Sequence, residues 1–116
     1  MSRLVAALIA LSLLGVPAHA VYNTPELQSF SNISATTSPF TLRGGQYAVT
    51  IHAGSWSSGS VTLQRLAVDG STYVTVLTAF SADGYASVYL PAGTYKFTVA
   101  SANAIYVDIS SIVTTM

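Results

Sequence analysis

Closely spaced turn signals divide the chain from residue 39 onward into short segments. The signals are Gly44-Gly45, Asp69-Gly70, Asp83-Gly84 and Pro91-Ala92-Gly93. Between them Val, Ile, Thr and Tyr predominate, and these residues favour half-buried strands. After residue 21 the apolar residues show no helical spacing. Short segments with a turn roughly every 8–14 residues are typical of antiparallel sandwiches and barrels.

Alternating apolar and polar residues mark the individual strands. In segment 46–52, for example, Tyr47, Val49 and Ile51 fall on one face. The predicted strands are 27–33, 40–42, 46–52, 61–68, 73–78, 85–90, 95–100 and 105–109. The sequence therefore predicts an all-β fold, a single antiparallel β-sandwich of jelly-roll type with about eight strands. A closed barrel remains open as the alternative.

The predicted strand 61–68 breaks the alternation. Val61 and Leu63 share one face, whereas Leu66 and Val68 have the opposite parity. A shift of one residue turns every later side chain to the other face, so we expect a β-bulge near residues 64 and 65. The alternative is a strand that is apolar on both faces and is covered on one of them by a partner subunit.

The first 20 residues have the plan of a secretory signal peptide. Arg3 precedes an apolar run over 4–16, and Ala18-His19-Ala20 has the small-x-small form that a signal peptidase reads. Cleavage after Ala20 would give a secreted or periplasmic protein. The alternative is a retained apolar arm that docks on a partner or lies in a membrane. We expect membrane contact only through residues 1–20, and only if they are retained.

Residues 21–38 are polar and end in the hydroxyl-rich run 34–38. We interpret this segment as an extended polar arm that leads into a β-sandwich domain over 39–116. Such an arm can add a strand to a neighbouring subunit. The domain organisation is then an apolar segment over 1–20, the arm over 21–38 and the sandwich.

Charge is scarce, with four Lys and Arg against four Asp and Glu, and there is no Cys. Nucleic-acid binding needs clustered Lys and Arg, so we expect no nucleic-acid partner. The absence of Cys excludes disulfides and thiolate metal sites. The composition fits a protein that works while packed against something else.

The residues needed for catalysis are not assembled in the sequence. His52 is the one His outside the first 20 residues, and no Ser, His and acid arrangement accompanies it. Asp69 and Asp83 lie in Asp-Gly turns, where Asp serves local hydrogen bonds. We therefore predict no catalytic, cofactor-binding or metal-binding residues and no enzymatic activity.

Aromatic residues supply the candidate contacts. Trp56 lies in the loop GSWSSG and either stacks on a ligand or folds back over the end of the sandwich. Tyr22, Tyr85 and Tyr106 are further candidate contact residues, and Tyr73 and Tyr89 could also supply contacts, although Tyr is also a normal strand residue.

Several stretches resemble small β-sandwich proteins that tailed phages and prophages encode among their virion structural genes. The stretches are GGQYAV, GSVTLQRLAVDGSTYVTV, ADGYASVYLPAGTY and AIYVDI, which lie within residues 40–112. The resemblance implies a capsid decoration or other virion-associated subunit without enzymatic activity. LPAGTY also resembles the corner before a late strand in secreted bacterial sandwich domains. There Tyr95 would act as a tyrosine corner whose hydroxyl bonds to the preceding loop.

Two functions follow as expectations. The first is a non-enzymatic virion structural protein, a capsid decoration or cement subunit, with capsid or other virion subunits and further copies of itself as partners. The second is an exported bacterial binding module, carbohydrate-binding or adhesive, with Trp56 as the contact residue and a glycan as partner. Neither needs a cofactor.

Overall fold

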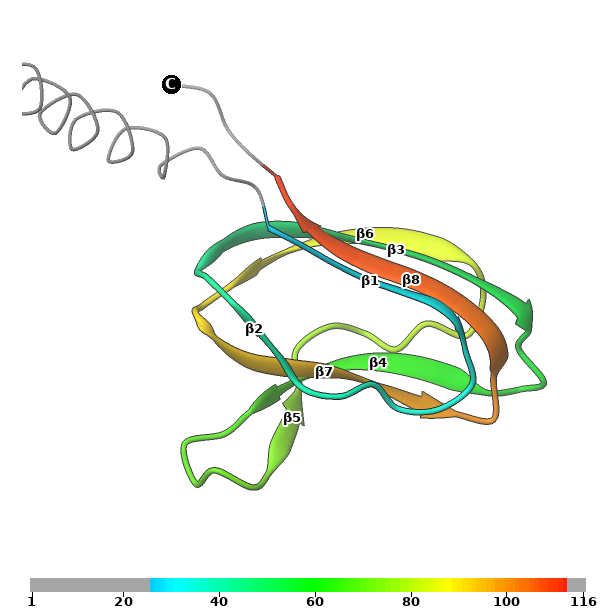
Figure 1. Cartoon of the computed structure of the whole chain (residues 1–116), viewed down its shortest axis with the longest axis horizontal. Helices are drawn as coiled ribbons and strands as arrows, with labels where there is room; N and C mark the ends of the chain where they lie inside the picture. Colours follow the sequence, from blue (N-terminus) through cyan, green and yellow to red (C-terminus); the bar gives the residue numbers. More distant parts are fainter. Residues whose placement is uncertain (1–25, 113–116) are drawn as a thin grey trace, which may run out of the picture.

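The computed structural model describes residues 26–112, which form eight strands in two layers (Figure 1). The strands are β1 (Leu27–Ile33), β2 (Phe40–Leu42), β3 (Gly45–Ser55), β4 (Ser60–Leu66), β5 (Tyr73–Thr75), β6 (Gly84–Leu90), β7 (Gly93–Ala100) and β8 (Asn103–Ser111). The expected signal-like segment 1–20 and Tyr22 lie outside the described residues. Within 26–112 no helix is long and apolar enough to cross a membrane.

The strands form two four-stranded sheets, the first in the order β1-β8-β3-β6 and the second in the order β2-β7-β4-β5. All the strand pairs are antiparallel. Besides β3–β8 and β4–β7, which lie at the centres of the two sheets, they join β1 to β8, β2 to β7, β3 to β6 and β4 to β5. One long hairpin rolled around a core would give this pairing, which is that of a jelly roll. The prediction of an antiparallel jelly-roll sandwich is confirmed, and the two separate sheets exclude a closed barrel.

The core lies between the two sheets and follows the predicted alternation. Tyr47, Val49 and Ile51 of β3 are buried, and Leu63 of β4 and Phe97 of β7 face them from the second sheet. The other buried hydrophobic residues are Phe40, Leu42, Ala53, Val61, Leu90, Tyr95, Ala102, Ile105, Val107 and Ile109. Because period-two patterning fixes which face of a strand is buried, the alternation in the sequence predicted the inward set of β3 correctly.

Strand β1 belongs to the sandwich and is not a free arm. It pairs with β8 of the same chain, with Phe30 opposite Val107. The Phe30 ring lies 5.6 Å from the Phe40 ring and 6.0 Å from the Phe97 ring, measured between centroids. The expected boundary at residue 38 therefore differs from the structure, in which β1 joins the first sheet. One edge of β1 is already paired within its own chain.

The hydroxyl-rich run 34–38 also has a structural role. Strand β2 pairs with β7 only as far as Tyr95. Beyond that point Thr37 Oγ1 accepts the Phe97 N–H at 3.1 Å, and Thr36 Oγ1 accepts the Val99 N–H at 3.0 Å. Side-chain oxygens thus satisfy backbone donors along the edge of β7, which would otherwise be open to edge-to-edge pairing.

The bulge expected in β4 is absent, and that prediction was wrong. β4 pairs with β7 without a register shift from Ser60 to Arg65. Arg65 takes an inward position at the end of the core, where its Nη2 donates to Ala92 O at 2.9 Å. β4 ends at Leu66, and Val68 lies beyond it in the loop. The alternation of apolar residues breaks in the sequence because the charged Arg65 occupies an inward position at the rim of the core.

Candidate functional site

The outer face of the first sheet carries a continuous row of polar and aromatic residues. The strand register places Ser29, Asp108, Thr50 and Tyr85 side by side across all four strands. Asp108 is partly exposed and takes part in neither of the ion pairs found among residues 26–112. The row therefore presents one carboxylate between two hydroxyl groups, with a tyrosine ring at the β6 end.

Asp83 joins three parts of the chain beside this row. Its Oδ2 lies 2.6 Å from His52 Nδ1, and its Oδ1 accepts hydrogen bonds from the Ala53 N–H at 3.0 Å and the Trp56 Nε1–H at 2.9 Å. The hydrogen bonds from His52, Trp56 and Ala53 lower the pKa of Asp83 to about 2. The sequence placed Asp83 in a local turn and missed these contacts, because its partners lie about thirty residues away in sequence.

His52 and Tyr106 are direct cross-strand neighbours on the same face. Their rings stack with centroids 6.1 Å apart and an angle of 25° between the planes. An ionised carboxylate can only accept, so a hydrogen bond to Asp83 requires the proton on His52 Nδ1. In the neutral ring, Nε2 is then an acceptor. Asp83 therefore fixes both the orientation and the tautomer of His52.

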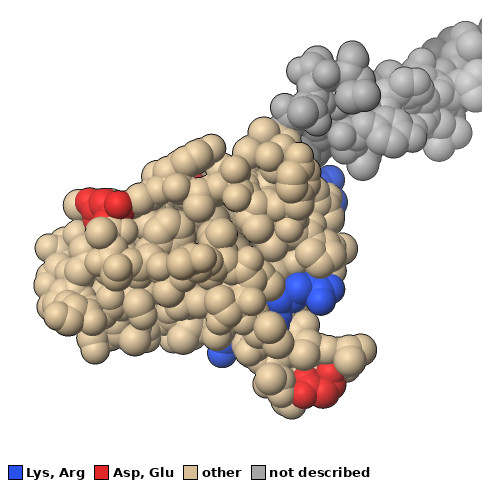
Figure 2. Space-filling view, turned by 180° about the vertical axis from the view of Figure 1, so that it is seen from behind, with Lys and Arg blue, Asp and Glu red and all other residues tan. Residues whose placement is uncertain are grey.

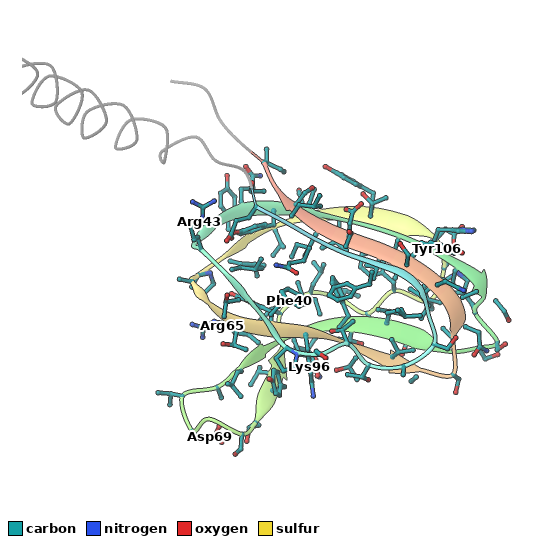
Figure 3. All side chains as sticks on the ribbon, in the orientation of Figure 1. Phe40, Arg43, Arg65, Asp69, Lys96 and Tyr106 are labelled. Carbon is teal, nitrogen blue, oxygen red and sulfur yellow. The ribbon has the colours of Figure 1, made fainter. Side chains whose placement is uncertain are left out.

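A shallow pocket of about 250 Å³ opens on this face. We call it the His52–Tyr106 pocket, and the residues of its polar lining are Ser29, Ser31, Thr50, His52, Tyr106 and Asp108. Tyr106 is labelled on the upper layer of Figure 3, at the opposite end of the sandwich from Arg43. The predicted contact residue Tyr106 thus belongs to a pocket with polar groups of several kinds.

Trp56 is not a free aromatic platform. It is half-buried, packs against the core and uses its indole N–H on Asp83. The loop holds it in place through a tight turn in which Ser57 and Ser58 have φ of 46° and 61° and Gly59 N–H donates to Trp56 O. Two positive φ values define a type I′ turn, which here carries the chain from β3 in the first sheet to β4 in the second. Of the two interpretations of Trp56, the structure favours the one in which it folds back.

Two further tyrosines, Tyr85 and Tyr89, lie on the outer face of the first sheet. Tyr85 on β6 is 66% exposed, and Tyr89 on the same strand is 77% exposed. Tyr85 is the register partner of Thr50, and Tyr89 has the same parity on β6, so both side chains point outward on the face that carries Thr50. The sequence suggested both as possible contacts, and the outward position of both follows from the alternation of β6.

A hairpin between β4 and β5 projects from the body of the molecule (Figure 1). We call residues 67–72 the projecting loop. Asp69, predicted as a turn residue, accepts the Ser71 and Thr72 N–H groups at 2.9 Å, and Thr72 Oγ1 donates to it at 2.6 Å. These bonds, first of all that from Thr72 Oγ1, lower the pKa of Asp69 to about 2. Gly70 has a φ of 80°, which favours glycine.

The projecting loop is ordered by its own hydrogen bonds, yet it presents an apolar side chain to solvent. Val68 is fully exposed, and Val74 on β5 is 52% exposed. Figure 2 shows few charges on the face that it draws, with an acidic group at the tip of the projection and basic groups near its base. Figure 3 labels Asp69 at the tip.

Two tyrosines secure the turns at one end of the sandwich. The Tyr95 hydroxyl donates to Pro91 O, the contact with the preceding loop that a tyrosine corner makes. The Tyr47 hydroxyl contacts Arg43 O in the same way, four residues back. Gly44 and Gly45 form the turn before Tyr47, as Ala92 and Gly93 do before Tyr95. The repeated Gly-x-Tyr pattern is a signal that could have identified the second corner.

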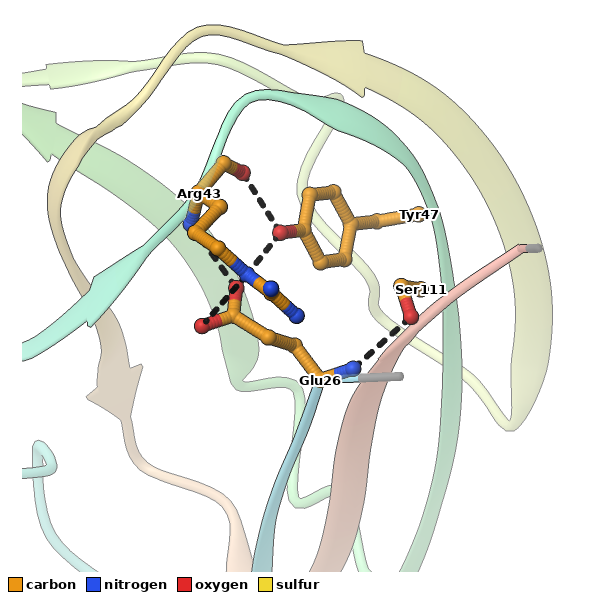
Figure 4. A network of polar contacts seen from close by, with 4 residues as sticks. All are labelled: Glu26, Arg43, Tyr47 and Ser111. Atoms are coloured by element: carbon orange, nitrogen blue, oxygen red, sulfur yellow. Dashed lines mark hydrogen bonds and ion pairs between the residues drawn. The ribbon is translucent and has the colours of Figure 1, made fainter. Parts of the chain in front are cut away.

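Glu26 fastens the start of β1 to this end (Figure 4). Its Oε1 accepts the Arg43 N–H and the Tyr47 hydroxyl, each at 2.7 Å, and its backbone N–H donates to Ser111 Oγ at 2.8 Å. Partial burial opposes ionisation, but the hydrogen bonds from Arg43 and Tyr47 lower the pKa of Glu26 overall. Burial, and then the bond to Glu26, raises the pKa of Tyr47.

The fold and these surfaces define a β-sandwich protein of jelly-roll type. No protein-family model matches the chain, and no curated protein sequence matches it significantly. Among solved structures, the SPBc2 prophage-derived protein YomS is similar to it, with a TM-score of 0.53 and 13% identity over 75% of this chain and 92% of that chain. At this identity the similarity concerns the fold alone.

Two further solved structures align less well. One is from disulfide-linked pili that form Bacillus endospore appendages, with a TM-score of 0.42 and 13% identity over 78% of this chain and 87% of that chain. The other is Aeromonas hydrophila PliG, a periplasmic inhibitor of g-type lysozyme, with a TM-score of 0.39 and 16% identity over 75% of this chain and 82% of that chain.

Proposed function

We propose that the protein is a non-enzymatic structural subunit of a phage virion, and that it decorates the capsid through surface contacts. The observation that carries this proposal is the projecting loop, which holds the fully exposed Val68 on a rigid frame. An ordered loop loses little conformational entropy on docking, so its apolar contact contributes more to affinity. Val68 contributes nothing to the core, which is consistent with a role outside the fold.

The character of the surface supports a protein partner. Interfaces are enriched in tyrosine and depleted in Lys, Glu and Asp relative to other surfaces. The exposed Tyr85 and Tyr89 and the low charge of the chain match that composition. The fold similarity to a prophage-derived protein supports the choice of a virion as the assembly, and a cement subunit would stabilise the shell by binding only its assembled form.

Association between copies belongs to the same proposal. The charge-poor faces favour contact between neighbouring subunits once a capsid surface concentrates them. A glycan platform on Trp56 is disfavoured, because the indole is half-buried and bonded to Asp83.

The test is a binding assay with particles purified from a host strain that lacks the gene. Purified wild-type protein should sediment with the particles, and Val68→Asp should fail to do so, because it buries a charge in the contact. Thr41→Asp on β2 is the matched control, since Thr41 is exposed at the other edge of the same sheet. Equal sedimentation of all three proteins would contradict the docking role of the projecting loop.

A further inference from the structure

The His52–Tyr106 pocket is not explained by the fold or by docking through the projecting loop. Its aromatic pair is preset, because Asp83 holds His52 against Tyr106 through the 2.6 Å contact to Nδ1. Its carboxylate, on Asp108, is partly exposed and lies between Ser29 and Thr50 in the strand register. We propose that this pocket binds one ring of a neutral saccharide.

The arrangement of donors and acceptors fits a sugar. A pyranose ring carries hydroxyl groups around its edge and C–H groups on its faces. A carboxylate accepts two hydrogen bonds from adjacent hydroxyl groups, and Ser29 and Thr50 can donate or accept beside it. The partly exposed Tyr106 ring offers an apolar surface for the C–H face.

The size and charge of the pocket limit the ligand further. A volume of about 250 Å³ is below the usual range for drug-sized ligands, so a single ring with the rest of the glycan outside is the expected occupant. No Lys or Arg lines the pocket, which disfavours phosphorylated or otherwise acidic sugars. The competing ligand class is a cationic amine, which Asp108 would also attract.

The residues that would bind the sugar are those of the His52–Tyr106 pocket and do not include Trp56. Here Trp56 acts only through Asp83, as part of the support that orients His52. The inference is also independent of the virion proposal, because it concerns the first sheet and can be tested on the purified chain.

The experiment is an NMR titration of the isotope-labelled full chain with glucose, galactose, mannose and N-acetylglucosamine, each at millimolar concentration. At least one sugar should shift the signals of Tyr106, His52 and Thr50. Tyr106→Ala should weaken binding about tenfold through loss of the aromatic contact. Asp108→Asn should weaken it as well. Tyr89→Ala is the matched control, since Tyr89 is exposed on the same sheet but does not line the pocket, and it should bind as the wild type does.

Three results would overturn the inference. The first is that none of the four sugars shifts these signals. The second is that Tyr106→Ala and Tyr89→Ala bind equally well, which would place the sugar elsewhere. The third is that lysine amide binds in an Asp108-dependent manner while the sugars do not, which would make the pocket a site for a cationic ligand. Thermal unfolding of each variant separates loss of binding from loss of fold.

Discussion

His52 of β3 and Asp83, which directly precedes the neighbouring strand β6, lie with His52 Nδ1 2.6 Å from Asp83 Oδ2. The same carboxylate accepts the indole N–H of Trp56, the sole tryptophan of the chain. The fluorescence of Trp56 therefore reports on this contact directly. It gives a simple measurement of whether the support behind the His52–Tyr106 pocket is intact.

The contact should have a defined pH dependence. The pKa of Asp83 falls from 3.8 in the unfolded chain to about 2 in the folded protein. The stability that the ionised Asp83 contributes is therefore complete above pH 3.8 and is lost as the pH falls toward 2. We expect the Trp56 emission of the folded protein to change in that interval. Asp69 has a lowered pKa in the same range, so the comparison with Asp83→Asn is essential. If the Trp56 emission of Asp83→Asn changes with pH as that of the wild type does, Asp83 is not the group that the fluorescence reports.

The Tyr47 corner should contribute more stability than an exposed tyrosine. Tyr47 is buried, and its hydroxyl meets Glu26 Oε1 and Arg43 O. Tyr47→Phe removes the single hydroxyl proton that these two acceptors share and should lower the free energy of unfolding by about 1–2 kcal/mol. Tyr89→Phe, which removes a hydroxyl in solvent, should be nearly neutral. Chemical denaturation measures both, and equal losses would argue against the corner.

Gly59 should be far less replaceable than Gly70. A Cβ at Gly59 would lie 2.1 Å from Ala100 O, whereas one at Gly70 would have no atom within 4 Å. Gly59→Ala must displace backbone and should cost about 2–4 kcal/mol. Gly70→Ala, with its φ of 80°, should cost about 1–2 kcal/mol. The reverse order in thermal unfolding would contradict the close approach of Gly59 to residues 100–102.

The type I′ turn offers a stabilising substitution. Ser58 has a φ of 61°, which is unfavourable for a residue with a Cβ. Ser58→Gly removes that strain from the folded protein, although the greater freedom of glycine in the unfolded chain offsets part of the gain. The substitution should raise the free energy of unfolding by up to about 1 kcal/mol. Ser58→Ala keeps the strain and serves as the control. A gain with alanine, or none with glycine, would rule out backbone strain as the cause.

The fold was largely predictable because period-two patterning and turn residues are local signals. β1 and β2 have the predicted bounds, and the inward set of β3 was identified correctly. The prediction for β4 failed where Arg65 takes an inward position, since parity of apolar residues cannot anticipate a charged residue at the rim of the core. Strand β5 is shorter than predicted and ends at Thr75.

The candidate site was less predictable because it depends on contacts between distant segments. The sequence named Trp56, Asp83 and Tyr106 separately, but nothing local indicates that Asp83 joins Trp56 to His52 or that His52 stacks on Tyr106. The roles of Tyr22 and of residues 1–20 remain predictions, as do the absence of enzymatic activity and association between copies.

The most direct test of the virion proposal is protein mass spectrometry of purified phage particles from a host that carries the gene. We predict peptides from this chain in the particle fraction, at a constant ratio to the capsid subunit through successive density gradients. Particles that contain the capsid subunit and infect normally, but yield no peptide of this chain, would contradict the account.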